Sequence, residues 1–296
     1  MTRAQFEEKE YEAAFLAELA QGSAPFGTVF ASGQVLEKLV GYDAAARPDP
    51  SHPVWALLGV PRPAGVRLLP TLWPRGSAPP LGRLPRSPVS LILQFKRPEW
   101  LSNANAGQWL FWGQGYFRFR ITRHQQSVLH RLEKRLGSLA LVRYAAPAFA
   151  TNSALEAAHL GRDTVASSGF VSPAALVRHR IWTYTVPGTA GRANPRARTR
   201  TFESAQQLGQ AFARLVVDQS QLVVADPVAD HVHSVAQVAG AIDPYTRRSV
   251  AEWRRRLSEG DIGLAPATLD SVADIATITT TLFAIGAVWC IVDLAL

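Results

Sequence analysis

The 296-residue chain is poor in sulfur-containing residues, with one cysteine and one methionine. A single cysteine, Cys290, excludes an intrachain disulfide framework and any zinc site built from several cysteines. This composition suits a reducing compartment, and we therefore expect a cytoplasmic protein. The N-terminal residues are acidic, and no uninterrupted apolar segment follows them, so we expect no signal peptide.

Long apolar runs are also scarce. The stretch 275–292 has 18 residues without a charge, which is near the lower limit for a membrane span. Four threonines and Gly286 interrupt it. We therefore expect a helix from about Leu269 to Ile285, a cap at Gly286 and a following strand, with a membrane anchor as the less favoured alternative.

Positive charge is abundant, with a formal net charge of +8 and an isoelectric point near 10.1. The excess is almost entirely arginine, and this balance favours a polyanionic partner such as nucleic acid. Biased codon usage in a GC-rich genome is the alternative source of so many arginines. No phosphate-binding Walker loop, nucleophile-elbow, zinc-protease or dinucleotide-binding motif is present.

The segment LILQFKRP (91–98) indicates a buried strand, because a short apolar run is closed by Pro98. Side chains alternate along a strand, so Gln94 and Lys96 should point to the same face. A lysine on a buried strand is unfavourable by several kcal/mol unless a negative group meets it. The alternative is a strand-edge lysine whose ammonium reaches solvent.

Two acidic residues upstream could meet that lysine. Glu37 lies on a helix predicted from Ser32 to Val40, and Asp43 enters the next strand. Two carboxylates, an amide oxygen and an ammonium are the components of a magnesium (or manganese) site for phosphodiester hydrolysis. A solvated helix face for Glu37 and ordinary turn chemistry for Asp43 are the alternatives.

The segment from Glu37 to Asp43, EKLVGYD, followed by LQFK (93–96), resembles the PD-(D/E)xK nuclease superfamily, in a variant with QxK. The resemblance implies a restriction-endonuclease-like αβββαβ core. It also implies that Asp43 is the central metal ligand, Gln94 the second ligand, Lys96 the catalytic lysine and Glu37 the acidic residue carried by a helix. Glu8 or Glu12 on the first predicted helix, 4–20, could replace Glu37.

The predicted elements fit an α/β fold with a mixed α+β sheet. After the lysine strand we expect a strand or hairpin over 109–122, a helix over 123–136 and a strand over 139–149. Thr122 and Gln125 form the sequence pattern of a capping box. We expect a nuclease-like core over 1–150, with a Pro-rich insertion over 47–88, and an accessory α/β region over 151–296 packed on the core.

The second half is expected to contain short helices, strands at 180–186 and about 220–225, and helices at 203–217 and 246–258. The segment 187–201, rich in Gly, Pro and Arg, is predicted to be a mobile loop. Asp226, Asp230, His231 and His233 form a polar cluster. We expect this cluster to be a polar loop, with a zinc site as the alternative.

Nucleic-acid contacts are expected from basic and polar residues near the lysine strand, which are Arg118, Arg120, Arg123, His124 and Gln126. The arginines of 192–200 are further candidates. Gln125 is predicted to complete the capping box rather than to assist the site.

These patterns favour a magnesium-dependent nuclease that hydrolyses DNA in preference to RNA, with a role in defence against foreign DNA. The rival hypothesis is a catalytically degenerate nuclease fold that binds nucleic acid or assembles with a partner protein, because Gln94 is neutral. A homo-oligomer or a partner protein is expected in either case, and a membrane is not.

Overall fold

The computed structural model describes residues 2–21, 65–68, 89–218, 227–242, 244–259 and 266–292. The central sheet has the strand order β2-β11-β3-β6-β7. β3 and β6 run parallel at its centre, and β11 pairs antiparallel with β3. The strands are β2 Gly65–Leu68, β3 Val89–Phe95, β6 Ala140–Pro147, β7 Ser168–Val171 and β11 Ala287–Val292.

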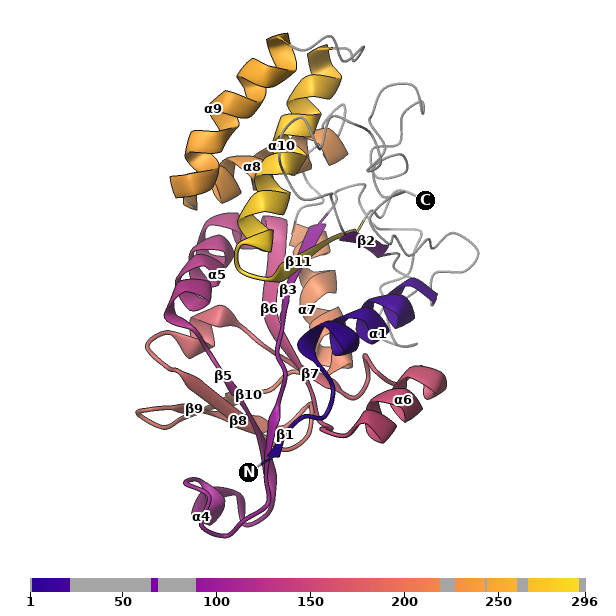
Figure 1. The fold of residues 1–296 in the computed structure, drawn as a ribbon, viewed down its shortest axis with the longest axis vertical. Helices are drawn as coiled ribbons and strands as arrows, with labels where there is room; N and C mark the ends of the chain where they lie inside the picture. The colour runs from indigo at the N-terminus through magenta and orange to yellow at the C-terminus, as the bar shows by residue number, and fades with distance from the viewer. Residues whose placement is uncertain are drawn as a thin grey trace.

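A second sheet, antiparallel throughout, has the order β1-β4-β5-β8-β9-β10. In Figure 1 it lies at the end of the molecule away from α8, α9 and α10, and the short helix α4 projects beyond it. Its strands are β1 Thr2–Arg3, β4 Glu99–Leu101, β5 Tyr116–Arg120, β8 Ile181–Tyr184, β9 Ala190–Asn194 and β10 Arg198–Thr201.

Two predictions about this sheet were wrong. The predicted loop 187–201 is the hairpin β9–β10, whose glycine has a packing role. A Cβ at Gly191 would lie 2.0 Å from the Trp182 ring, so the glycine that suggested a loop is what lets β9 pack on β8. The stretch 109–122 is not a continuous strand or a hairpin, because it begins with the helix α4 Trp109–Trp112 before β5.

Helices flank the central sheet. α5 connects β3 to its parallel neighbour β6, and it begins at the predicted cap, Thr122, whose hydroxyl accepts a hydrogen bond from the Gln125 backbone N–H. The helices are α1 Glu8–Gln21, α5 Arg123–Leu136, α6 Asn152–Gly161, α7 Ala205–Asp218, α8 Pro227–Ile242, α9 Pro244–Glu259 and α10 Pro266–Phe283, with 3₁₀ helices η3 Gly137–Leu139 and η4 Pro173–Leu176.

The two faces of the central sheet bury separate apolar clusters, as the alternation along β3 requires. Leu91, Leu93 and Phe95 pack in one cluster with residues of α1 and α7. Ile92 packs on the other face with residues of α5, α8 and α10. Figure 1 shows α1 and α5 on opposite sides of β3. The result is three layers, helix–sheet–helix, built on mixed strands.

The C-terminal prediction was confirmed. α10 ends at Phe283, Gly286 has a left-handed φ of 66°, and β11 follows. β11 lies between β2 and β3, so it is part of the central sheet. Within the ranges described, no helix is long and apolar enough to cross a membrane.

The mixed α/β class was therefore predicted correctly, as were the predicted elements β3, α5, β6 and α9. Both sheets combine strands from the regions 1–150 and 151–296: in the second sheet β5 pairs with β8, and in the central sheet β11 lies between β2 and β3. The predicted helix 32–40, the strand that begins near Asp43, the strand 54–60 and the strand near 220–225 lie outside the described residues.

Candidate functional site

Lys96 lies just beyond the end of β3, on the face covered by α5. Its backbone N–H donates to the Ala145 carbonyl at 2.8 Å, which extends the pairing of β3 with β6. Lys96 is 7% exposed, and its Nζ donates to Gln125 Oε1 at 2.9 Å and lies 5.7 Å from the centre of the Tyr144 ring. The predicted buried lysine is therefore confirmed, and a neutral amide is the group that accepts from it.

Gln125 joins three segments at this point. Its Oε1 accepts from Lys96, and its Nε2 donates to the Ile285 carbonyl in the turn before β11 at 3.0 Å. The prediction that its side chain completes a capping box was wrong, because Thr122 caps the helix through the Gln125 backbone while the amide turns toward Lys96. A glutamine with both ends fixed holds the lysine in one orientation.

The electrostatic environment of Lys96 is unusual for a buried cation. In the described part of the chain, no carboxylate lies within ion-pairing distance of its Nζ. Burial lowers the pKa of Lys96, and the negative charge of Glu8 partly opposes that shift. Among the described residues, no ion pair offsets this desolvation cost.

α1 brings acidic residues toward this end of β3. A Glu8 carboxylate oxygen accepts from the backbone N–H of Arg97 at 3.2 Å. Glu12, one turn further on, is buried, and burial raises its pKa despite its ion pair with Lys9 at 2.7 Å. The position of Glu8 therefore fits the alternative prediction, in which a residue of α1 replaces Glu37 as the acidic residue of the site.

Gln94 lies in the middle of the sheet, where it pairs in register with Ala287 of β11 and Tyr144 of β6. It is 0% exposed, its Nε2 donates to the Phe95 carbonyl at 3.1 Å, and its Oε1 is buried without a hydrogen-bond partner among the described residues. A Cβ at Gly286 would lie only 3.7 Å from Gln94 Nε2. An orphaned amide oxygen is a hard donor of the type that Mg²⁺ accepts.

The predicted carboxylate ligands, Asp43 and Glu37, lie outside the described residues. Among the residues that are described, no group of three His, Cys, Asp or Glu side chains could hold a metal ion. Of the predicted ligands, the described residues therefore include Gln94, whose Oε1 has no hydrogen-bond partner there, and the alternative carboxylate Glu8. The magnesium site with Asp43 as central ligand remains a prediction.

The residues predicted to contact nucleic acid differ in what their side chains meet. Arg118 and Arg120 both bond to Glu99, at 2.5 Å and 3.2 Å. Gln126 is buried, with its Nε2 donating to Pro173 and its Oε1 accepting from Tyr144 Oη. Arg123 and His124 are exposed at the start of α5.

Asp230, His231 and His233 lie on the helix α8, so their prediction as a polar loop was wrong, whereas Asp226 lies outside the described residues. His231 and His233 lie two residues apart on α8, and their rings meet different partners. His231 Nε2 lies 2.7 Å from Ser90 Oγ, whereas His233 Nδ1 lies 2.8 Å from Asp274 Oδ2. Residues i and i+2 of a helix do not share a face, so this pair does not chelate one zinc ion.

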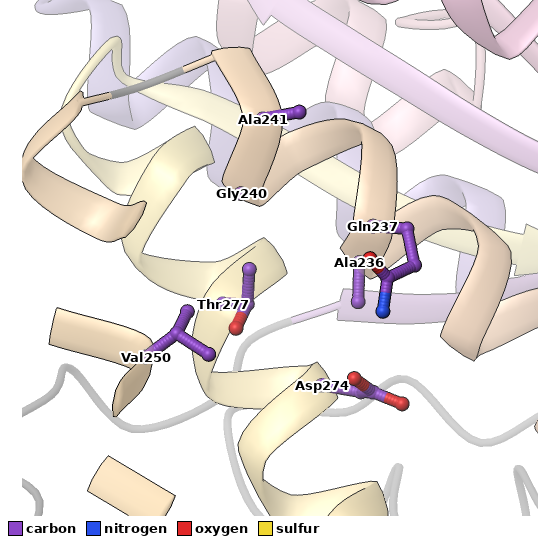
Figure 2. Close-up of a pocket in the computed structure, with 7 residues that line it drawn as sticks. All are labelled: Ala236, Gln237, Gly240, Ala241, Val250, Asp274 and Thr277. Atoms are coloured by element: carbon purple, nitrogen blue, oxygen red, sulfur yellow. The ribbon is translucent and has the colours of Figure 1, made fainter. Parts of the chain in front are cut away.

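Asp274 also lines a small pocket between α8, α9 and α10, with a volume of about 210 Å³. Figure 2 shows its carboxylate, the Gln237 amide and the Thr277 hydroxyl around that space. The Thr277 hydroxyl donates to the Ala273 carbonyl at 2.7 Å, which is helix-internal bonding. Lys96 does not line this pocket, and the described residues that line it include no basic side chain that could bind a nucleic acid.

Comparison with known proteins identifies no relative: no family model, no curated protein and no solved structure matches the chain. The site therefore stands on its own geometry.

Two contributors escaped the sequence. Tyr144, on the neighbouring strand, covers Lys96 with its ring, and Ile285 fixes Gln125 through a backbone carbonyl. Neither contribution leaves a sequence signal. An aromatic residue in an apolar strand has the pattern of an ordinary core residue, and every residue carries a main-chain carbonyl. Gln125 did leave a signal, but the same spacing also describes a helix cap.

Proposed function

We propose that the protein is a metal-dependent nuclease that hydrolyses phosphodiester bonds, with Lys96 at its centre. One observation carries the proposal: Lys96 is buried with no carboxylate partner, and on the same face of β3 the amide oxygen Gln94 Oε1 is buried with no hydrogen-bond partner, both among the described residues. Buried polar groups without partners are rare in cores and are concentrated at functional sites.

The proposed roles follow from the contacts. Gln125, fixed by Ile285, orients the Lys96 ammonium, and the ammonium donates hydrogen bonds to a phosphate oxygen as negative charge develops there. Low solvent access strengthens that interaction relative to one in water. Asp43, Gln94 and Glu37 or Glu8 are the proposed ligands of Mg²⁺ or Mn²⁺. A bound divalent ion would polarise the phosphate and lower the pKa of an attacking water.

The proposed substrate is nucleic acid, DNA in preference to RNA, and the role in defence against foreign DNA rests on the resemblance of EKLVGYD and LQFK to the nuclease superfamily. The exposed Arg123 and His124 at the start of α5 support a polyanionic substrate near the Lys96 end of β3. A homo-oligomer or a partner protein is part of the same proposal.

The test is a cleavage assay on DNA and RNA with Mg²⁺, with a chelator as the blank. The proposal expects cleavage that depends on the metal and that falls by about 10²-fold or more in both Lys96→Ala and Asp43→Ala. Cleavage that is unchanged in both variants would overturn the assignment of the site.

A degenerate, non-cleaving nucleic-acid-binding protein is the second candidate, and the neutral Gln94 favours it because a carboxylate binds Mg²⁺ more strongly. The variant Gln94→Glu separates the two. If the wild type binds DNA without cutting it and Gln94→Glu gains metal-dependent cleavage, the second candidate is correct. If the wild type cuts and Gln94→Glu changes only its metal requirement, the first candidate is correct.

A further inference from the structure

A second cavity lies on α5, on the side of Gln126 rather than Gln125. It encloses about 490 Å³ between α5 and the residues that link η4 to β8. That volume lies within the range of small-ligand sites, ~300–1,000 Å³. Of the described residues that line it, none is acidic and six are basic: Arg123, His130, Arg131, Arg178, His179 and Arg180.

Three arginines of this cavity lack the carboxylate partners that Arg118 and Arg143 have. Arg118 bonds to Glu99 and Arg143 to Glu203, so their charges are balanced. Arg123, Arg178 and Arg180 are exposed and form no ion pair with any described carboxylate. Several guanidinium groups around one cavity repel one another, and a bound anion removes that repulsion.

The inner wall offers hydrogen-bonding groups without partners. His130 Nδ1 is buried and has no partner among the described residues. His179 is buried, and its Nδ1 donates to the Pro195 carbonyl at 2.8 Å, which leaves its Nε2 for a ligand. Val177 adds an apolar surface that is 38% exposed. Arg178 has a φ of 68°, in the left-handed region that residues with a Cβ seldom adopt.

We propose that this cavity is a binding site for a phosphate ester of nucleotide size. The arginines take the phosphate, because guanidinium groups bind phosphate oxygens in pairs of parallel hydrogen bonds. Val177 and the imidazoles of His130 and His179 contact the organic part of the ligand. The phosphate comes either from a free nucleotide or from the end of a strand. The cavity shares Arg123 with the proposed nucleic-acid contacts, but Lys96 and Gln94 do not line it, so phosphate binding here does not require the proposed nuclease activity.

The experiment is a calorimetric titration of the full chain with inorganic phosphate, adenosine monophosphate and adenosine. The probes are repeated on the double variant Arg123→Gln/Arg180→Gln and on the matched control Arg135→Gln/Arg248→Gln, which removes two exposed arginines from other surfaces. We expect the monophosphate to bind, adenosine not to bind, and the affinity to fall by about tenfold or more in the pocket variant alone.

Competition by a 5′-phosphorylated oligonucleotide distinguishes the two sources of the phosphate. If it displaces the monophosphate, the site accepts a strand end; if it does not, the site takes a free nucleotide. The proposal is overturned if neither phosphate nor the monophosphate binds the wild type, or if both double variants lose affinity equally. Failure of the nuclease would show in the Lys96→Ala cleavage assay and would leave these titrations unaffected.

Discussion

Two buried cations lie on the two parallel strands at the centre of the sheet, and their partners differ completely. Arg143 on β6 is 9% exposed and meets two carboxylates, Glu203 at 2.7 Å and Glu133 at 3.4 Å. Lys96 at the end of β3 is 7% exposed and meets one neutral amide, Gln125. The first is an ion-pair network with two counter-charges; the second is a cation without a counter-charge among the described residues.

The presence or absence of carboxylate partners distinguishes a buried cation that stabilises the fold from one that can bind a ligand. A buried cation whose carboxylates are in place has no capacity left for a ligand, and its removal leaves those carboxylates unpaired. A buried cation without a counter-charge raises the energy of the empty site and is relieved when an anion such as a phosphate arrives. We expect Arg143 to govern stability and Lys96 to govern activity.

The largest effect on stability is expected at Arg143. Arg143→Met removes the cation that Glu203 and Glu133 share, which should lower the free energy of unfolding by about 3–5 kcal/mol. Urea denaturation measures the change. The variant Arg143→Met/Glu203→Gln/Glu133→Gln should recover part of it, because the unpaired charges are gone. A loss below about 1 kcal/mol would remove the contrast with Lys96.

A third buried base, His231, sharpens the comparison, because it meets the Ser90 hydroxyl and no described carboxylate. Burial lowers the pKa of His231 from 6.5 to about 4. The unfolded chain then binds more protons than the folded one below pH 6.5, so stability should be lost as the pH falls from 6.5 to about 4, by up to about 3 kcal/mol.

NMR titration of the His231 ring protons measures that pKa directly, and acid denaturation of His231→Gln supplies the control. A ring that titrates near 6.5 would show that burial in this core does not disfavour charge. A desolvation cost would then not be expected for the Lys96 ammonium either.

Removal of Lys96 should do little to stability. Lys96→Met gives up one hydrogen bond to Gln125 but also removes the desolvation of an unpaired ammonium, so the free energy of unfolding should change by less than about 1 kcal/mol. Urea denaturation beside Arg143→Met makes the comparison within one protein. A loss as large as that of Arg143→Met would mean that Lys96 is structural.

The smallest effect is the pH dependence that Lys96 adds. Burial holds its pKa below 10.5, so between the folded pKa and 10.5 the unfolded chain binds the extra proton. The stability of the wild type should therefore rise with pH in that window relative to Lys96→Met. The chain has four lysines, so NMR of the labelled side chains resolves each one. Titration of Lys96 together with the other three would contradict the account.

Much of this contrast could be predicted from the sequence, because β3, α5 and β6 are local patterns. The apolar run before Pro98 predicted a strand, and alternation placed Gln94 and Lys96 on one face, where Lys96 indeed meets α5. Likewise, the Gly286 cap predicted the change from helix to strand at the C-terminus.

The remaining features depend on contacts between distant segments. The insertion of β11 between β2 and β3 joins residues about 200 positions apart, and no local pattern encodes it. The hairpin β9–β10 was hidden because Gly191 is required by the Trp182 ring rather than by a turn. The position of Gln125 in the sequence fits both a capping box and a residue that assists the site. Only its hydrogen bonds with Lys96 and Ile285 in the structure show that its side chain turns toward Lys96 instead of completing the capping box.

The most direct test of the central claim compares two lysines in one cleavage assay. Lys96→Met and Lys134→Met remove the same group, from the buried end of β3 and from an exposed position in the last turn of α5. With Mg²⁺ and DNA, at equal folded fractions, we predict that Lys96→Met loses about 10²-fold or more of the cleavage rate while Lys134→Met retains it. Equal rates in the two variants would contradict the account.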